Sequence, residues 1–167
     1  MSPLSIEDFC HFLRTPSGLV VGIDVGTRRT GLALSDVRHR FAYPWQLVSH
    51  ASLKEGVSAV ASWIEQEDVL CLVIGWPREM SGAIGAQCQK VSKFAEDLFV
   101  CVEKPFFLWD ERLSTVAVTR TLREARVPYK KHGNLIDKSA AMHLLQGALD
   151  LGWLSIKDPG PNGIGVP

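Results

Sequence analysis

The order of the apolar segments is the feature that most restricts how this chain can fold. Three short strand-like runs follow one another closely, at Leu19–Val25, Thr30–Ser35 and Phe41–Val48. The turns between them are short enough for hairpins, so we expect these three strands to be antiparallel. Two later apolar runs, Val69–Ile74 and Phe106–Trp109, indicate buried strands, and each follows a segment with helical periodicity.

The segments between and after these later strands predict helices. One begins after Ser52, because Ser52 and Glu55 have the spacing of a capping box. A second covers about 85–99, a third begins near 114, and a fourth covers about 134–152. Helical crossovers make the strands that they join parallel. The chain therefore predicts an α/β fold with one mixed five-stranded sheet and helices on both faces.

With 167 residues, the chain fits a single domain of common size. We expect an N-terminal extension over 1–17, one folded domain over 18–153, and a flexible tail over 154–167. The tail is expected because the end of the sequence is rich in proline and glycine.

Composition excludes several classes of protein. Eighteen basic side chains balance eighteen acidic ones, so attraction to nucleic acid has to come from a local patch. No apolar run is long enough to span a bilayer, and no basic, then apolar leader is present, so we expect a cytoplasmic protein without membrane contact. The four cysteines lie far apart, which argues against zinc ligation and a disulfide framework and predicts buried free thiols. They are Cys10, Cys71, Cys88 and Cys101.

Acidic residues stand where the apolar elements end. Asp24 closes the first strand, Asp110 and Glu111 close the last, and Asp137 lies in the first turn of the final helix. Ligands of such sheets gather at the carboxyl ends of the strands. Carboxylate oxygens are the ligands that Mg²⁺ and Mn²⁺ prefer, and such ions support phosphodiester hydrolysis. The pattern therefore predicts a metal-dependent nuclease site.

Each acid also has a simpler interpretation. Asp24 can hold an Asx turn, and Asp137 can cap the final helix three residues after Asn134. However, Asp137 lies on the apolar stripe of that helix, where a carboxylate is costly unless it is paired or coordinated. Asp110 and Glu111 point to opposite faces of the strand, so we expect only one of them to serve the site.

A local basic patch is also predicted. Its members lie in the first hairpin, on the outer side of the third helix, and in the loop that follows it: Arg28, Arg29, Arg120, Arg123, Lys130 and Lys131. The alternative is a solvated face with a few ion pairs. The closeness of Arg28 and Arg29 to Asp24 in the sequence favours phosphate contact.

Four segments together resemble the bacterial YqgF/RuvX family. They read GIDVGTRRTGLALSD, VIGWPREMSGAIGAQ, LWDERLST and LIDKSAAMHLLQGALD. The family is described both as pre-16S rRNA processing nucleases and as Holliday junction resolvases, with an RNase H-like fold. The resemblance implies that Asp24, Glu111 and Asp137 are the catalytic acids and hold Mg²⁺ or Mn²⁺, with Asp110 as a weaker candidate. It leaves the substrate open between pre-rRNA and branched DNA, and it leaves a homodimer open.

The chain departs from the family pattern at residues 75–82. That segment lacks the usual Asn and Asp, so a role of those two side chains in positioning substrate is not expected here. Two rival functions remain open. The hairpin around Asp24 also matches the phosphate-binding hairpin of actin-like ATPases and sugar kinases, although those enzymes close two such domains over ATP. The other rival is a nucleic-acid-binding protein that does not cleave.

Overall fold

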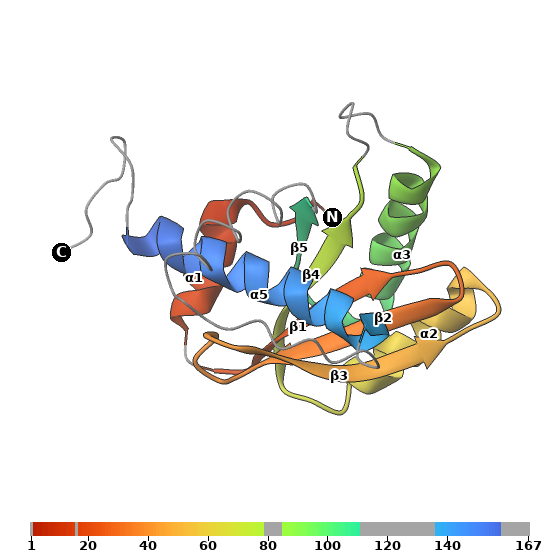
Figure 1. Ribbon diagram of the computed structural model, residues 1–167, viewed down its shortest axis with the longest axis horizontal. Helices are drawn as coiled ribbons and strands as arrows, with labels where there is room; N and C mark the ends of the chain where they lie inside the picture. Colours follow the sequence, from red (N-terminus) through yellow and green to blue (C-terminus); the bar gives the residue numbers. More distant parts are fainter. Residues whose placement is uncertain (1, 16, 79–84, 111–135, 158–167) are drawn as a thin grey trace.

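The computed structural model describes residues 2–15, 17–78, 85–110 and 136–157; at 136–139 and 156–157 it describes the backbone alone. Within these ranges the elements follow in the order α1 (Ile6–Arg14), β1 (Leu19–Val25), β2 (Arg29–Ser35), β3 (Ala42–Ser49), α2 (Leu53–Ile64), β4 (Val69–Trp76), α3 (Ala86–Val102), β5 (Phe106–Asp110) and α5 (Ile136–Lys157) (Figure 1). The helix predicted to begin near residue 114 lies outside the described residues.

The strands form one mixed sheet in the order β3-β2-β1-β4-β5. β1 pairs with β2 and β2 with β3 in antiparallel fashion, whereas β1 pairs with β4 and β4 with β5 in parallel. The predicted mixed five-stranded sheet is therefore confirmed. Its strand directions place the end of β1 beside the ends of β4 and β5, at one edge of the sheet.

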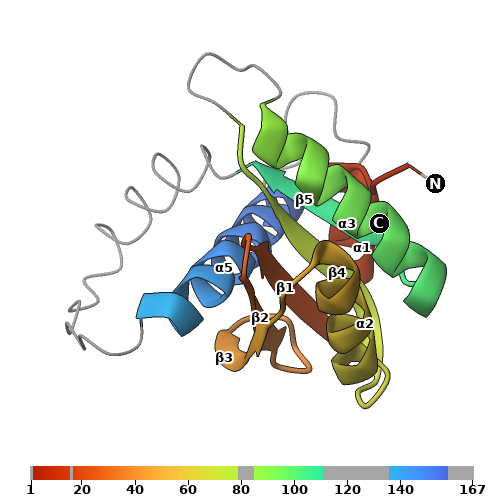
Figure 2. The same ribbon diagram turned by 90° about the vertical axis from the view of Figure 1, so that its right-hand side faces the viewer.

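Helices cover both faces of the sheet, as predicted. Figure 2 shows α5 on one side and α2 with α3 on the other. The core is accordingly divided in two by the sheet. One cluster joins the alternating side chains Val21, Ile23 and Val25 of β1 to α2 and α3. The other joins Val20 to α1 and α5.

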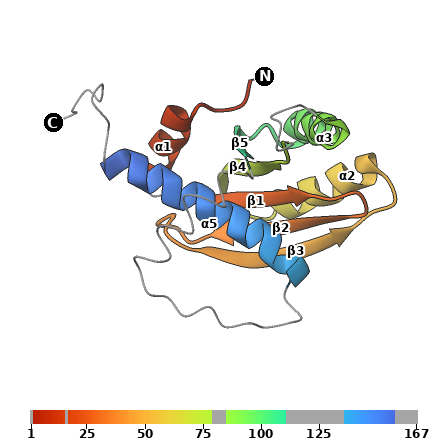
Figure 3. The ribbon, with the colours of Figure 1, turned by 45° about the horizontal axis from the view of Figure 1, so that its top comes forward.

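The N-terminal helix packs into the second of these clusters. The Phe9 side chain is fully buried, and its ring stacks on Phe107 of β5 with 4.7 Å between the ring centroids. α1 lies beside the C-terminal half of α5 (Figure 3). The contact is close: a side chain at Gly152 of α5 would meet Leu13 of α1. α5 continues past the predicted end at Gly152 to Lys157, because this glycine serves helix packing and not helix termination.

Two local predictions can be checked directly. The capping box of α2 forms: the Ser52 hydroxyl accepts from the Glu55 N–H at 3.3 Å, and the Glu55 carboxylate accepts from the N–H of Ala51 at 2.9 Å. Three cysteines are buried free thiols, as predicted, whereas Cys101 near the end of α3 is exposed. Among the described helices, none has the length and apolar character needed to cross a membrane.

Candidate active site

Asp24 lies near the carboxyl end of β1, on the face of the sheet that α5 covers. Strand alternation decides the face, because Ile23 and Val25 both point into the cluster below α2 and α3. Gly31 of β2 is the cross-strand partner of Asp24, and Leu47 of β3 is the partner of Gly31. The three residues form one row across three strands.

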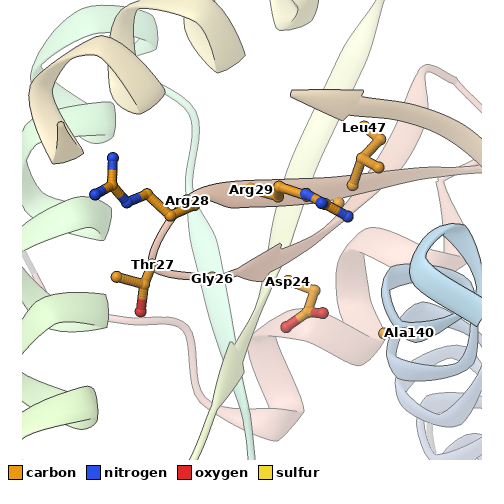
Figure 4. A pocket seen from close by; sticks show the side chains of 8 residues that line it. Asp24, Gly26, Thr27, Arg28, Arg29, Leu47 and Ala140 are labelled. Atoms are coloured by element: carbon orange, nitrogen blue, oxygen red, sulfur yellow. The ribbon is translucent and has the colours of Figure 1, made fainter. Parts of the chain in front are cut away.

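This row lies in an open pocket of about 500 Å³. The other lining residues come from the β1–β2 hairpin and from α5: Gly26, Thr27, Arg28, Arg29 and Ala140. Figure 4 shows the carboxylate of Asp24 between the hairpin and α5. Because Gly31 has no side chain, no atoms fill the space between Asp24 and Leu47 above the sheet. The Asp24 carboxylate therefore borders the open part of the pocket.

A close contact sets the position of α5 over this pocket. A Cβ atom at Gly22 would lie 2.6 Å from the Cβ atom of Leu145 and 3.0 Å from the carbonyl oxygen of Ala141. Only glycine lets the helix approach β1 this closely. Gly22 and Asp24 are two residues apart and share a face of the sheet. The first turns of α5 therefore lie next to Asp24, where Ala140 enters the pocket lining.

The hairpin that carries the two arginines is held tightly. Gly26 donates its N–H to the Arg29 carbonyl at 2.9 Å, and a side chain at Gly26 would strike that same carbonyl. From the residue after β3, the backbone N–H of His50 donates to the Arg28 carbonyl at 3.0 Å. The His50 ring also lies 3.0 Å, Nε2 to Oγ1, from Thr30. Bonds within the hairpin and bonds to the residue after β3 thus hold the hairpin beside Asp24.

The two hairpin arginines differ in direction. Figure 4 shows the Arg29 side chain extending toward Leu47, on the same side as Asp24, and the Arg28 side chain extending the opposite way. The register agrees, since Arg29 is two residues from Gly31 along β2. Arg29 is thus the arginine that stands over the pocket, while Arg28 reaches the rim.

The electrostatic state of Asp24 follows from its burial. Partial burial raises the pKa of its carboxyl above the usual value, because desolvation disfavours the charged form. A nearby cation reverses that effect. The position therefore suits a carboxylate that is neutralised by a bound ion when it acts.

Asp110 lies on the other face of the sheet. It ends β5 and pairs in register with Trp76, which packs against the cluster below α2 and α3. Its carboxylate lies 3.9 Å from the guanidinium of Arg78. The preceding residue, Trp109, packs into the cluster on the α5 side. Alternation thus places Asp110 and Asp24 on opposite faces of the sheet.

The remaining predicted residues are described less fully. The backbone of Asp137 forms part of the first turn of α5, and its side chain lies outside the described residues. The others also lie outside the described residues: Glu111, Arg120, Arg123, Lys130 and Lys131. Within the ranges that the structure describes, no three His, Cys, Asp or Glu side chains lie close enough together to hold a metal ion.

Sequence reasoning did not assign five residues of the pocket lining to the site: Gly26, Thr27, Gly31, Leu47 and Ala140. Gly31 follows from the register of the first hairpin, once four residues are assigned to its loop. The pairing of Leu47 with Gly31 depends on an irregularity in the β2–β3 register between Leu32 and Ala33. No local sequence pattern predicts that irregularity. Ala140 follows Asp137 by three residues in the sequence, and that helical spacing is the signal for it.

Comparison with known proteins adds independent findings. The family model RuvX, described as "Holliday junction resolvase", matches residues 18–151. A protein of Rhizobium meliloti named "Putative pre-16S rRNA nuclease" is 39% identical over 150 residues, covering 90% of this chain and 90% of the relative. A protein of Methylocella silvestris with the same name is 41% identical over 135 residues, covering 81% and 84%.

A solved structure shows the same fold. RuvC of T. thermophilus, in complex with a Holliday junction substrate, covers 80% of this chain and 94% of its own, with a TM-score of 0.50 and 15% sequence identity. A match at that identity concerns the fold alone, and it confirms the RNase H-like arrangement expected from the sequence. The predicted class of enzyme, a nuclease, is the one that the relatives' names give. The family model and the relatives together show that this chain belongs to the RuvX family.

Proposed function

We propose that this protein is a metal-dependent nuclease that processes the 5′ end of pre-16S rRNA. The observation that carries the proposal is the Asp24 pocket: a half-buried carboxylate stands at the carboxyl end of β1, between the N-terminal part of α5 and an arginine-bearing hairpin. The names of the relatives indicate the proposed substrate, and the residues of the pocket indicate the proposed reaction.

The residues of the pocket fit a divalent cation. Carboxylate oxygens suit Mg²⁺ or Mn²⁺, and burial raises the pKa of Asp24 in a way that a bound cation would offset. We propose Glu111 and Asp137 as the other ligands, since Glu111 follows the last strand and Asp137 lies in the first turn of α5. When bound, such ions lower the pKa of a water molecule and neutralise charge on the phosphate. The expected products are a 3′-hydroxyl and a 5′-phosphate.

Positive side chains around the pocket would hold the phosphates. Arg29 stands over the pocket and Arg28 at its rim (Figure 4). We propose that Arg120, Arg123, Lys130 and Lys131 extend this surface. Guanidinium groups suit phosphate because their N–H donors bind two oxygens at once. The neutral net charge makes this local set the source of affinity.

Branched DNA is the second candidate substrate, because the family model is described by that activity. A homodimer acting in the cytoplasm fits either substrate, and we propose it for both. A site of this kind contacts the phosphate backbone and does not recognise base sequence. The protein therefore has to recognise its substrate by shape.

The experiment compares cleavage of a pre-16S rRNA fragment and a four-way DNA junction, side by side, with Mg²⁺, Mn²⁺ or EDTA. We expect divalent-dependent cleavage of the RNA at its 5′ boundary. The variants Asp24→Asn, Glu111→Gln and Asp137→Asn should each abolish it while the protein stays folded and binds nucleic acid. Cleavage of the junction alone would select the second candidate.

Asp110→Asn is the matched control. It removes one carboxylate next to Glu111 in the sequence, but on the opposite face of the sheet from Asp24. We expect it to keep most of the activity. Full activity of Asp24→Asn at saturating Mg²⁺, or loss of activity in Asp110→Asn alone, would contradict the proposed site.

A further inference from the structure

A second basic pocket lies at the opposite end of the sheet from Asp24. It has a volume of about 220 Å³ and lies between α1, the β2–β3 connection at residues 36–41, and α5. Its lining includes Arg14 of α1, Arg38, His39 and Arg40 of the connection, and Trp153 of α5. Neither the sequence motifs nor the proposed active site accounts for it.

The charge of this pocket is positive. Arg14, Arg38 and Arg40 are all exposed, and in the described part of the chain none of them forms an ion pair. The nearest acid in the connection, Asp36, is already engaged: its Oδ1 accepts the backbone N–H groups of Arg40 at 2.6 Å and Phe41 at 2.9 Å. The lining of the pocket therefore contains three arginines and no carboxylate.

The connection is rigid although it is a surface loop. The ring nitrogens of the fully buried His39 lie 3.2 Å from the carbonyl oxygen of Leu13 and 3.1 Å from that of Gly18. The His39 carbonyl in turn accepts from the indole N–H of Trp153 at 2.7 Å. These bonds tie the loop to α1, to the start of β1 and to α5. A binding group held in this way loses little entropy when a ligand arrives.

One arginine is fixed in place by an aromatic ring. The guanidinium carbon of Arg40 lies 3.7 Å from the centre of the Trp153 ring. The backbone carbonyl oxygen of Arg40 accepts a hydrogen bond from the Gln146 side chain at 2.9 Å, so the Arg40 backbone is held as well. A guanidinium that stacks on an aromatic face keeps the N–H donors of its edge for a planar or tetrahedral oxyanion.

The size of the pocket limits the ligand. Pockets for small organic ligands have volumes of about 300–1,000 Å³. A pocket of about 220 Å³ with three arginines at its lining suits a phosphate group better than a whole nucleotide. We infer that this pocket binds a phosphate of the nucleic-acid strand whose scissile bond lies at Asp24. The inference rests on the proposed nuclease function.

Both pockets lie along α5, on the same face of the sheet. Ala140 lines the pocket at Asp24 and Trp153 lines the second one. Thirteen helical residues separate them, which is about 20 Å at 1.5 Å per residue. β2 runs between the same two ends and also spans about 20 Å. At a rise of about 3.4 Å per nucleotide, the value for a B-form duplex, the bound phosphate lies about six nucleotides from the cleaved bond, and slightly more in an A-form RNA duplex, whose rise is smaller.

The test compares the double variant Arg38→Ala/Arg40→Ala with the control Lys54→Ala/Lys90→Ala. The control removes two exposed positive charges from α2 and α3, on the other face of the sheet. Binding of labelled RNA duplex is measured in EDTA at several salt concentrations. We expect the arginine variant to weaken binding about tenfold and to lower the log–log salt slope by about one to two, with the control unchanged.

Substrate length sharpens the test. With flanks of about ten base pairs on each side of the cleavage site, the arginine variant should raise KM and leave kcat unchanged, whereas with flanks of about three base pairs it should match the wild type. The single variant Arg38→Ala, which keeps the stack on Trp153, should show the same length dependence if the double variant folds poorly. A length-independent effect would overturn the inference.

Further outcomes separate this inference from the proposed function. Wild-type cleavage together with unchanged binding by the arginine variants would overturn the inference and leave the nuclease proposal intact. Absence of any cleavage or binding by the wild type would overturn both. Thermal stabilisation by inorganic phosphate that the double variant loses, with unchanged RNA binding, would assign the pocket to a free anion and overturn the nucleic-acid inference.

Discussion

Replacing Gly22 by alanine tests whether close packing of α5 on β1 builds the active site. The new Cβ atom would lie 2.6 Å from Cβ of Leu145 and 3.0 Å from the Ala141 carbonyl oxygen. Neither atom is the free end of a flexible side chain, so the helix itself has to move. Ordinary van der Waals contact between such carbon atoms needs about 3.5–4.0 Å, so we expect a shift of about 1 Å.

The cost of that shift can be estimated in two parts. Overpacking of a core costs about 1–3 kcal/mol, while the loss of a glycine stabilises by about 0.4–1 kcal/mol through the unfolded chain. The free energy of unfolding should therefore fall by about 1–2 kcal/mol. A misplacement of about 1 Å at a catalytic group can lower the rate about a hundredfold. Because the first turns of α5 move away from Asp24, kcat per folded molecule should fall by as much as about a hundredfold. The loss of stability leaves most molecules folded, so it does not account for a fall of that size.

Urea denaturation gives the stability, and single-turnover cleavage of the RNA with Mg²⁺ gives the rate. Gly152→Ala is the control, since its Cβ atom would meet the flexible end of Leu13 and lie 3.4 Å from the Phe9 ring, at the other end of α5. We expect this control to lose some stability and to cleave at the wild-type rate per folded molecule. Wild-type stability and cleavage in Gly22→Ala would refute the reasoning.

Three further predictions concern stability. Burial raises the pKa of Asp24, so the ionised form of this carboxyl lowers the free energy of unfolding. Asp24→Asn should therefore be more stable than the wild type at pH 7 in EDTA. Urea titrations should show this gain in stability vanishing as the pH falls below about 4, where the wild-type carboxyl is protonated in the folded and the unfolded chain. Burial alone would raise the pKa of Asp36, but backbone N–H donors lower it, so Asp36→Ala should be less stable at neutral pH, with the difference lost in acid as the wild-type carboxylate protonates. Ser52→Ala removes the cap of α2 and should cost about 1 kcal/mol in thermal or urea unfolding, with cleavage per folded molecule unchanged.

Much of the fold could be predicted because its signals are local. The β1 strand was predicted with the bounds that the structure shows, since an apolar run before a Gly-rich turn needs no distant information. The capping box at Ser52 likewise marked the start of α2. The position of Asp24 at the end of β1 also followed from the sequence, and with it the place where a ligand should bind.

Signals that depend on distant partners were misinterpreted. Gly152 ends a helix by the ordinary rule, yet α5 continues through it because α1 packs against its bare backbone. The exposure of Cys101 near the end of α3 also depends on which face of that helix reaches solvent. In both cases the deciding contact joins segments that no local window contains.

The sequence by itself determined the order of strands and helices along the chain, the strand directions, the acids at the strand ends and the family, because periodicity, turns and motifs are written in neighbouring residues. Tertiary structure alone decided that Gly31 and Leu47 share a row with Asp24, and that Asp110 faces away from it. It alone brought Arg14, Arg40 and Trp153 around one pocket. Register and helix approach depend on packing between residues as far apart as Ala42 and Gln146, which are 104 positions apart, and such packing exists only once the chain has folded.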